Sequence, residues 1–516
     1  MDARESGDTS PGRWAVVHVR AGTHTPSLQD AASPTEPRAF LSWIAPYAVW
    51  VGALLYAVTL TLESIGRYEG FAGSFDGAHY NQLLWLISEG RDPFSTVVNR
   101  PLLADHFQPT LVLLTPVYWL GLGYPGILTA QAIAVALTGP ALYALARAAG
   151  ASPRLAAVPA ITWLVCPWVA AANVFEFHPY AFAPVLLVLS VYAAIERQHI
   201  LLAVTTVLAL GLKEDLALTY VVLGGLVAWR GDRRVGGLVA AGAALWFAGA
   251  YAVVSSYGPA YENYGRRFGG SRGETVGDAL RWMLVHPLEA LSDIASQSLL
   301  LLVVLLLATL FIALLAPWWL LLSVPTALHN ALSAFEPQHH LHAHYQLGTL
   351  AGLFIAAAFG VRRVSSLSRW QRFAVPITVG VWAVATVVGW SLPLGGEELS
   401  PRQARDVRYA LDRIPPEAPV SATSSLLGHL TLRTEAYSLP EPFEEVDWGS
   451  TLSRAEYARR ARGVRYVALR DADLLPTGGF TPPRAASSIE PLLRRLGFVE
   501  VARAGDVRIL ERAPLP

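Results

Sequence analysis

The chain has 516 residues, of which 53% are hydrophobic and only 15% carry a charge. Its mean hydropathy of +0.39 is typical of a polytopic membrane protein and excludes one large soluble core. The formal net charge is zero, so no strongly basic face exists and nucleic acid is excluded as a partner. Cys166 is the only cysteine, and an intrachain disulfide therefore cannot form.

Residues 1–40 are rich in Pro, Ser, Thr, Gly and charge, which predicts a disordered, cytoplasmic N-terminal segment. They lack the short apolar core and small-residue cleavage site of a signal peptide. The first strongly apolar run, 43–62, is expected to be an uncleaved anchor. It opens a membrane domain that we place at residues 41–395.

Apolar segments recur along this domain, and a helix needs roughly 20 residues to cross the hydrocarbon. They lie near 107–121, 127–146, 155–172, 179–195, 199–212, 216–229, 235–257, 298–316, 317–335, 345–361 and 373–393. Several are shorter than a full span, and the pair that flanks Lys213 could be half-helices or one broken helix. The pattern predicts a helical bundle with about ten to thirteen crossings.

Arginine clusters indicate how the chain crosses the membrane, because cytoplasmic loops carry an excess of basic residues. The clusters are Arg147 with Arg154, Arg197, Arg230 with Arg233 and Arg234, and Arg362 with Arg363, Arg369 and Arg372. Placing them in the cytoplasm puts the first loop, residues 63–109, on the opposite face, together with 176–178, 213–215, 258–297 and 336–346. Segment 107–121 must then be re-entrant or interfacial, unless Arg147 is misplaced.

The composition changes after Pro393. Residues 396–516 carry regular charge, with helical patterns at 401–413, 452–462 and 487–496 and alternating patterns at 464–469 and 507–511. We expect a soluble α/β domain of about 120 residues, which is enough for its own core. The final span leads outward, so this domain is predicted outside the cytoplasm.

The first loop gathers more polar side chains than a connection between two membrane helices needs. They are Asp76, His79, Tyr80, Gln82, Asp105 and His106. Apolar residues recur at helical spacing from Ala78 to Glu89, which predicts a short helix lying flat in the membrane interface. We interpret this loop as the active centre.

Asp76 stands at the start of the expected helix. Its carboxylate could act as a general base that takes a proton from an acceptor hydroxyl, with His79 and Tyr80 lining the same pocket. The alternative is an N-cap that satisfies the first amides of the helix. Asp105 and His106 could orient an acceptor, bind a phosphate or help to hold a divalent metal ion, or His106 could be a buried, hydrogen-bonded side chain at a helix start.

Lys213, Glu214 and Asp215 form an ionisable cluster inside an apolar stretch. Such groups must face a cavity or one another, because exposure to lipid costs several kcal/mol. Lys213 is the only lysine among 39 basic residues, and its compact charge suits a phosphate. A self-neutralising cluster at a helix break is the alternative.

Two further polar groups adjoin apolar segments. Glu176 and His178, at spacing i and i+2, share a face only if their turn is extended; polar capping of a helix end is the alternative. The run EPQHHLHAHYQ at 336–346 would align His340, His342 and His344 only as a strand. Its spacing matches no closed zinc site, and we place His344 and Tyr345 at the outer mouth of the next span.

Six stretches carry a resemblance to a known family. They are FDGAHYNQLLW (75–85), DHFQPTLVLLTPVYWL (105–120), EFHPYAFAPVLL (176–187), LKEDLAL (212–218), HYQLGTLAGLF (344–354) and VSATSSLLGHLTLR (420–433). From about residue 45 to 513 the chain resembles the bacterial and archaeal membrane family known as domain of unknown function 2079, placed near the glycosyltransferase C superfamily.

The resemblance implies an integral membrane enzyme that uses a lipid-phosphate-linked sugar. The catalytic acid of the superfamily lies in the first extracytoplasmic loop, and Asp76 is the matching position. Many family members carry a Gly-Ile-Tyr-like sequence after an Asp-Leu pair, whereas this chain continues from Asp76 with Gly77-Ala78-His79-Tyr80. The frequent acidic pair near the first span is absent, which weakens the case for a metal-dependent enzyme.

We therefore expect a glycosyltransferase that moves a sugar, with inversion, from a polyprenyl-phosphate donor to an acceptor outside the cytoplasm. The predicted catalytic residues are Asp76, His79 and His106. The predicted substrate-binding residues are Tyr80, Gln82, Asp105, Glu176, His178, Lys213, Glu214, Asp215, His344 and Tyr345. A transporter or flippase coupled through residues 213–215, and an inactive membrane scaffold, are the alternatives; the oligomeric state is left open.

Overall fold

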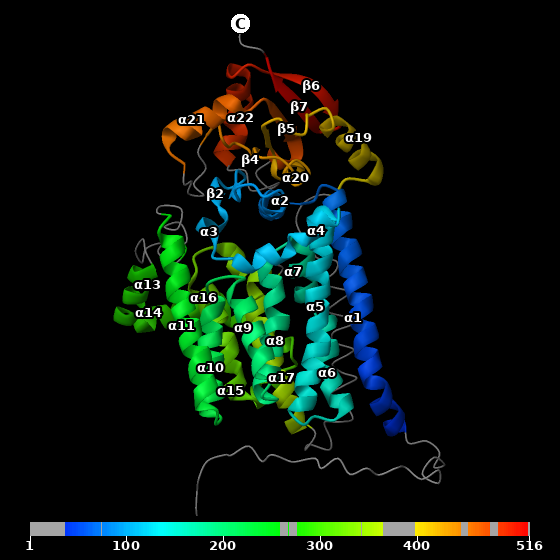
Figure 1. Cartoon of the computed structure of the whole chain (residues 1–516), viewed down its shortest axis with the longest axis vertical. Coiled ribbons are helices and arrows are strands. Elements are labelled where there is room, and N and C mark those ends of the chain that lie inside the picture. The colour runs from blue at the N-terminus through cyan, green and yellow to red at the C-terminus, as the bar shows by residue number, and fades with distance from the viewer. Residues whose placement is uncertain are drawn as a thin grey trace, which may run out of the picture.

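A bundle of apolar helices carries a small mixed α/β domain at one end (Figure 1). The structure is a computed structural model that describes residues 37–73, 75–257, 267, 276–341, 343–364, 398–444, 452–474 and 483–513. The expected N-terminal segment up to residue 36, the expected span near 373–393 and His342 lie outside the described residues.

The bundle consists of helices whose apolar residues cover most of their surface. They are α1 (Pro37–Glu69), α5 (Gly123–Ala148), α6 (Pro153–Leu164), α7 (Pro167–Phe175), α8 (Ala183–Ile195), α9 (His199–Leu210), α10 (Leu216–Trp229), α11 (Arg233–Ser255), α13 (Val276–Val285), α14 (Pro287–Leu307), α15 (Pro317–Leu320), α16 (Val324–Leu332) and α17 (Leu347–Val364). Proline sits in the first turn of several of them, including α6, α7 and α8, where its missing N–H costs no helical hydrogen bond.

Within the described residues, four helices are long and apolar enough to cross a membrane, or five if the pair α6–α7, bent by 41°, forms one span. Four shorter apolar helices accompany them: Pro179–Ile195, His199–Leu210, Leu216–Trp229 and Ser298–Leu307. The chain is thus mostly helical with several candidate spans, as predicted. The figure of ten to thirteen crossings stays a prediction.

The segment 107–121 contains no long helix. It forms a 3-10 helix over Pro109–Leu114 and the short helix α4 (Pro116–Trp119), so the arginine-based topology needs no extra crossing there. Farther along the chain, the expected span 317–335 is also divided, into α15, a 3-10 turn at Leu321–Ser323 and α16.

The C-terminal domain is a five-stranded sheet flanked by helices. Its elements are α19 (Pro401–Leu411), β3 (Val420–Ala422), α20 (Ser424–Leu427), β4 (Ala436–Ser438), α21 (Arg454–Gly463), β5 (Tyr466–Arg470), α22 (Pro483–Arg495), β6 (Phe498–Ala504) and β7 (Val507–Arg512). The strand order is β4-β3-β5-β7-β6. β3 is parallel to β4 and β5, whereas β7 is antiparallel to β5 and β6. The predicted α/β class is therefore present.

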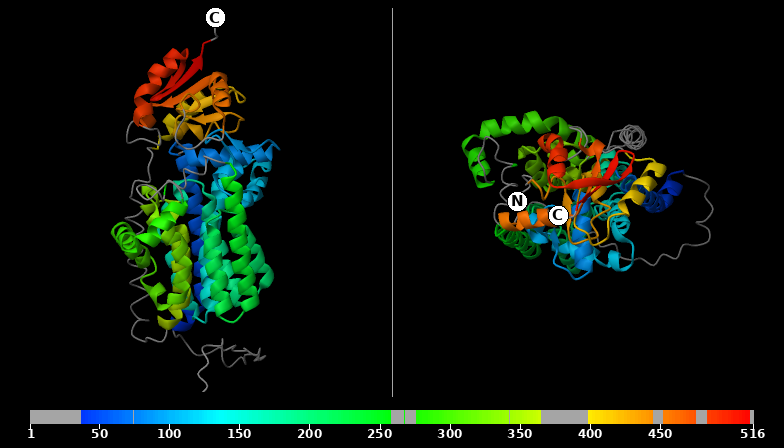
Figure 2. Two further views of the ribbon diagram at one scale, coloured as in Figure 1. Left: turned by 90° about the vertical axis from the view of Figure 1, so that its left-hand side faces the viewer. Right: turned by 90° about the horizontal axis from the view of Figure 1, so that it is seen from above.

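Helix α2 (Phe75–Ser88), expected from the apolar spacing at 78–89, lies between the bundle and the C-terminal domain (Figures 1 and 2). A short hairpin of β1 (Phe94–Ser95) and β2 (Arg100–Pro101) and the helix α3 (Leu102–Asp105) follow it. Most of α2 is buried, including its polar side chains His79, Asn81 and Gln82. The C-terminal domain thus covers a helix that the sequence predicts to lie flat in the membrane interface.

The last turn of α1 holds the C-terminal domain. The His429 imidazole stacks on the Tyr68 ring, with centroids 4.2 Å apart, and its Nε2 donates a hydrogen bond to the Tyr68 carbonyl at 2.9 Å. The Phe71 ring lies 4.1 Å from the same imidazole. Ion pairs join Arg67 to Glu398 and Arg408 to Glu69.

This contact should be sensitive to acid. Burial lowers the pKa of His429 to about 4, outweighing the hydrogen bond to Tyr68, which raises it. In the unfolded chain the imidazole titrates at about pH 6.5. The neutral, buried imidazole therefore stabilises the fold fully above that pH, and this stabilisation is lost as the pH falls toward 4. We expect about 2 kcal/mol of stability to disappear between about pH 7.5 and pH 5, measured as a lower thermal unfolding temperature of the purified protein in detergent.

The control is His429→Phe, which keeps a ring between Tyr68 and Phe71 but removes the titrating group. Its unfolding temperature should fall less than that of the wild type over the same pH range. An equal pH dependence in both proteins would contradict the assignment to His429.

Candidate active site

The turn after α7 is held in an extended form by one buried side chain of α5. Gln131 is fully buried; its Nε2 donates to the carbonyls of Asn173 and Glu176 at 2.9 and 3.0 Å, and its Oε1 accepts from the His178 N–H at 2.8 Å. Glu176 and His178 have extended backbone angles. Their side chains therefore project to the same side, as the sequence analysis required for a shared face.

Both side chains reach the first turn of α2. Glu176 Oε2 accepts a hydrogen bond from the Gly77 N–H at 2.9 Å, and His178 Nε2 lies 3.3 Å from Asp76 Oδ2. Asp76 itself lies inside the first turn, where the helix dipole favours a carboxylate. The capping role considered for Asp76 is thus taken at Gly77 by Glu176, and a Cβ at Gly77 would come within 2.3 Å of the Tyr124 hydroxyl.

Aromatic rings pack around the His178 imidazole that contacts Asp76. The His178 imidazole stacks on His344 with centroids 3.6 Å apart, and the Tyr80 ring meets His178 edge-on at 6.3 Å. We call Asp76, Tyr80, His178 and His344 the Asp76 cluster. Its carboxylate is 31% exposed, so it is oriented by a buried partner and still accessible to a second molecule.

His79 and Gln82 belong to a separate, buried network. His79 Nδ1 lies 2.9 Å from Ser95 Oγ and its Nε2 lies 3.8 Å from Asp105 Oδ2, while Asp105 Oδ1 accepts from Arg100 at 2.8 Å. Burial lowers the pKa of His79, although the Asp105 charge raises it. The imidazole is 3% exposed, and its proposed role in lining a pocket with Asp76 stays a prediction.

His106 reaches a third place, the break between α9 and α10. Its Nδ1 lies 2.8 Å from Glu214 Oε1, and the Phe107 N–H donates to Oε2 at 3.0 Å. Burial raises the pKa of this carboxyl, but the charge and hydrogen bond of His106, with Lys213, outweigh it and lower the pKa to about 2. Through these two contacts Glu214 ties the first loop to the bundle.

Lys213 stays near this carboxylate but pairs elsewhere. Its Nζ lies 3.6 Å from Asp215 Oδ2 and 5.7 Å from the centre of the Tyr180 ring. The charges of the 213–215 cluster are thus partnered, and both interpretations of the cluster from the sequence stay predictions.

Arg267 is a cation near the cluster that sequence reasoning missed. Its guanidinium lies 4.2 Å from the centre of the Phe335 ring, and its charge acts on His344 and Tyr345. Gln131 was missed as well. Gln131 could have been found as a lone amide inside an apolar helix. Arg267 could have been found as an arginine in the loop 258–297, which is predicted to lie on the same face as the first loop.

The described residues of the histidine-rich run form turns and no strand, so the condition for aligning His340 and His344 on one side is not met. Pro337 opens a 3-10 turn at Glu336–His339, and a second turn follows at His344–Gln346. His339 Nε2 lies 2.8 Å from the Ser333 carbonyl, and His340 lies 3.5 Å from Glu336. Among the residues that the structure describes, no three His, Cys, Asp or Glu side chains are grouped to hold a metal ion.

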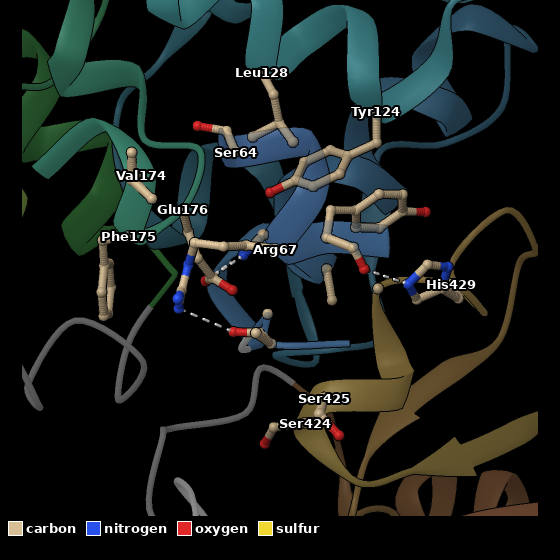
Figure 3. A pocket seen from close by; sticks show the side chains of 16 residues that line it. Ser64, Arg67, Tyr124, Leu128, Val174, Phe175, Glu176, Ser424, Ser425 and His429 are labelled. Atoms are coloured by element: carbon tan, nitrogen blue, oxygen red, sulfur yellow. Dashed lines mark hydrogen bonds between the residues drawn. The ribbon is translucent and has the colours of Figure 1, made fainter. Parts of the chain in front are cut away.

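A small cavity of about 30 Å³ lies between the bundle and the C-terminal domain, large enough for one or two water molecules. Figure 3 shows Arg67 and Glu176 on the bundle side and Ser424, Ser425 and His429 on the other. Glu176 lines this cavity, whereas Asp76, His106, Lys213 and His344 do not.

Comparison with known proteins gives one family and two solved structures. The family model described as "Predicted membrane protein (DUF2079)" matches residues 67–459. No curated protein matches the chain. The crystal structure of ArnT from Cupriavidus metallidurans bound to undecaprenyl phosphate is similar at 14% identity and a TM-score of 0.48, covering 91% of this chain and 100% of that one.

The apo structure of the same ArnT is similar at 13% identity and a TM-score of 0.48, covering 92% of this chain and 100% of that one. At this identity and TM-score, the similarity does not assign the ligand or the activity of ArnT to this chain. The family model spans most of the sequence, from the end of α1 through the C-terminal α21. The chain is a multi-pass membrane protein and belongs to the DUF2079 family of predicted membrane proteins.

Proposed function

We propose that the chain is an integral membrane glycosyltransferase that transfers a sugar from a polyprenyl-phosphate donor to an extracytoplasmic acceptor, with Asp76 as the general base. The observation that carries the proposal is the carboxylate of Asp76, partly exposed and 3.3 Å from His178 Nε2. A general base needs access to the acceptor and a fixed direction, and the first turn of α2 with His178 supplies both.

In the proposed reaction, the oxygen of the acceptor hydroxyl attacks the sugar carbon, and the Asp76 carboxylate accepts the proton of that hydroxyl. The bond from that carbon to the phosphate oxygen breaks, and the lipid phosphate leaves with the electron pair. His178, stacked on His344, limits the rotation of the carboxylate. His79 and His106, which the sequence analysis also assigned to catalysis, stay predictions.

Two cations are available for the leaving phosphate. Lys213 lies beside the Tyr180 ring. Arg267 lies over the Phe335 ring, which meets the ring of Tyr345, the neighbour of His344, edge-on. A compact ammonium and a planar guanidinium are the two groups that proteins use for phosphate recognition. We assign Lys213 to the donor phosphate, because it lies at the break between two apolar helices where a lipid tail could enter.

The arrangement favours an enzyme over a transporter coupled through residues 213–215. His178 contacts both Asp76 and His344, and His106 connects the same first loop to Glu214. These titratable groups therefore meet around the first loop, on helix α2 and the segments that contact it. A coupling pathway needs groups at several depths of the membrane.

Asp76→Asn should abolish transfer and leave folding and donor binding largely unchanged. The amide keeps the size of the side chain and its hydrogen bonding, but it cannot accept the acceptor proton, and general-base assistance is worth about 10²–10⁴ in rate. Sugar release from a panel of polyprenyl-phosphate donors would be measured together with thermal unfolding.

Asp92→Asn is the matched control, because Asp92 is an exposed carboxylate of the same loop and should be substituted without loss of rate. Early unfolding of Asp76→Asn with retained turnover would refute the catalytic role. Substrate uptake into vesicles would be measured in parallel, and uptake without any transfer by the wild type would favour the transporter.

Lys213→Met should weaken binding of the donor roughly ten- to hundred-fold, because a hydrogen bond to a charged group is worth about 1.5–3 kcal/mol. Lys213→Arg keeps the charge and should retain most of the affinity. Equilibrium binding of a polyprenyl phosphate to detergent-solubilised protein measures both variants. Unchanged affinity in Lys213→Met would remove Lys213 from the donor site.

A further inference from the structure

The amide of Gln82 has a partner at each of its hydrogen-bonding positions, and those partners come from two parts of the chain. Its Nε2 donates to Thr96 Oγ1 at 2.8 Å and to the Arg433 carbonyl, in the C-terminal domain, at 3.1 Å. Its Oε1 accepts from the Thr96 N–H at 2.9 Å and from Ser95 Oγ at 3.2 Å. Gln82 is fully buried, so the loss of any partner leaves a polar group without solvent.

Thr96 continues this connection into the sheet of the C-terminal domain. Its hydroxyl donates to the Ala436 carbonyl at 2.8 Å and accepts from the Ala436 N–H at 2.9 Å. Ala436 is the first residue of β4. Thr96, between the two strands of the hairpin that follows α2, thus binds both the N–H and the carbonyl of the first residue of the edge strand.

Neighbouring Asn81 makes a second link of the same kind. Its Nδ2 donates to the Gly428 carbonyl at 3.0 Å and to Thr431 Oγ1 at 2.9 Å, while its Oδ1 accepts from the Tyr118 hydroxyl at 2.6 Å. Two successive residues of α2 therefore bond to the C-terminal domain.

The connection ends at the candidate site. Ser95 Oγ, bonded to Gln82, also lies 2.9 Å from His79 Nδ1, and His79 Nε2 faces Asp105 at 3.8 Å. His79 lies three residues after Asp76 on the same helix, and the Asp76 charge acts on it. A continuous buried chain of polar contacts thus runs from β4 to the first loop.

We infer that the C-terminal domain is a positioning element of the site: through Gln82 and Thr96 it holds α2 and the β1–β2 hairpin so that His79, Asp105 and Asp76 take their places. Gln82 and Thr96 are positioning residues that touch no substrate. The site is then assembled only when the C-terminal domain is docked. The inference rests on the proposed function for its effect on rate, and its effect on order can be measured without any reaction.

Thr96→Val tests the inference, because valine fills the same space without the hydroxyl. In the full-length protein, amide hydrogen exchange in peptides covering 75–88 and 94–105 should speed up by roughly tenfold. The kcat for sugar transfer should fall by about 10²-fold, the size expected for a displacement of catalytic groups by about 1 Å, with little change in the KM for the donor. Thr96→Ser, which restores the hydroxyl, should recover both.

The matched control is Thr205→Val. Thr205 is as buried as Thr96, at 3% against 2% exposure, but its hydroxyl bonds within the bundle to Ser190 and the Leu201 carbonyl. The Thr205→Val variant should leave amide hydrogen exchange in peptides 75–88 and 94–105 unchanged. Equal exchange in Thr96→Val and the wild type would overturn the inference, and so would faster exchange with an unchanged kcat.

The two proposals fail in different ways. If the wild type transfers no sugar from any donor, the proposed function fails, and the exchange measurement alone then decides whether the C-terminal domain holds α2. If the wild type is active and Thr96→Val retains both its kcat and its exchange pattern, the proposed function stands and the positioning inference falls.

Discussion

Helix α2 is buried on both sides, and the placement of every other part of the candidate site depends on this constraint. Leu83 and Leu84 pack into a cluster with Tyr124 and Ile127 of the bundle, whereas Asn81 and Gln82 bond to the C-terminal domain. A buried amide must find partners or cost the free energy of its desolvation. The C-terminal domain supplies those partners, so the helix is fixed between two bodies that fold from distant parts of the chain.

The bundle supplies a second constraint, which is the turn after α7 that Gln131 holds in place. Without that amide, the carbonyls of Asn173 and Glu176 would lose their partners inside an apolar bundle. With it, Glu176 and His178 reach the first turn of α2 from the side opposite the C-terminal domain. Helix α2, which carries Asp76, therefore lies between the bundle below it and the C-terminal domain above it (Figure 1).

The buried charges follow the same logic. An ionisable side chain in an apolar segment needs a partner, and Glu214 finds His106 of the first loop more than a hundred residues away. This pair joins the loop to the α9–α10 break and brings Lys213 to the same end of the bundle. Polar groups that lie far apart in the sequence come together because burying each one without a partner in an apolar surrounding costs free energy.

Much of the local structure could be predicted from the sequence. Apolar spacing predicted α10 to the residue and α2, α5 and α11 to within about four residues, and charge with alternation predicted α19, β5 and β7. β3 and β4 were missed because strands of three residues carry too little periodicity, and β6 because a bulge at Glu500 and Ala502 interrupts its alternation.

What the sequence determined by itself is the class of the protein and the residues that carry charge into apolar surroundings, because hydropathy and the cost of burying charge act locally. The tertiary structure decided the partners. It divided the polar residues of the first loop into the Asp76 cluster, the His79 network and the His106–Glu214 pair, and it recruited Gln131 and Arg267 from elsewhere. Spacing along a chain cannot specify these pairings, since they form between segments that meet only when the bundle and the C-terminal domain pack on α2.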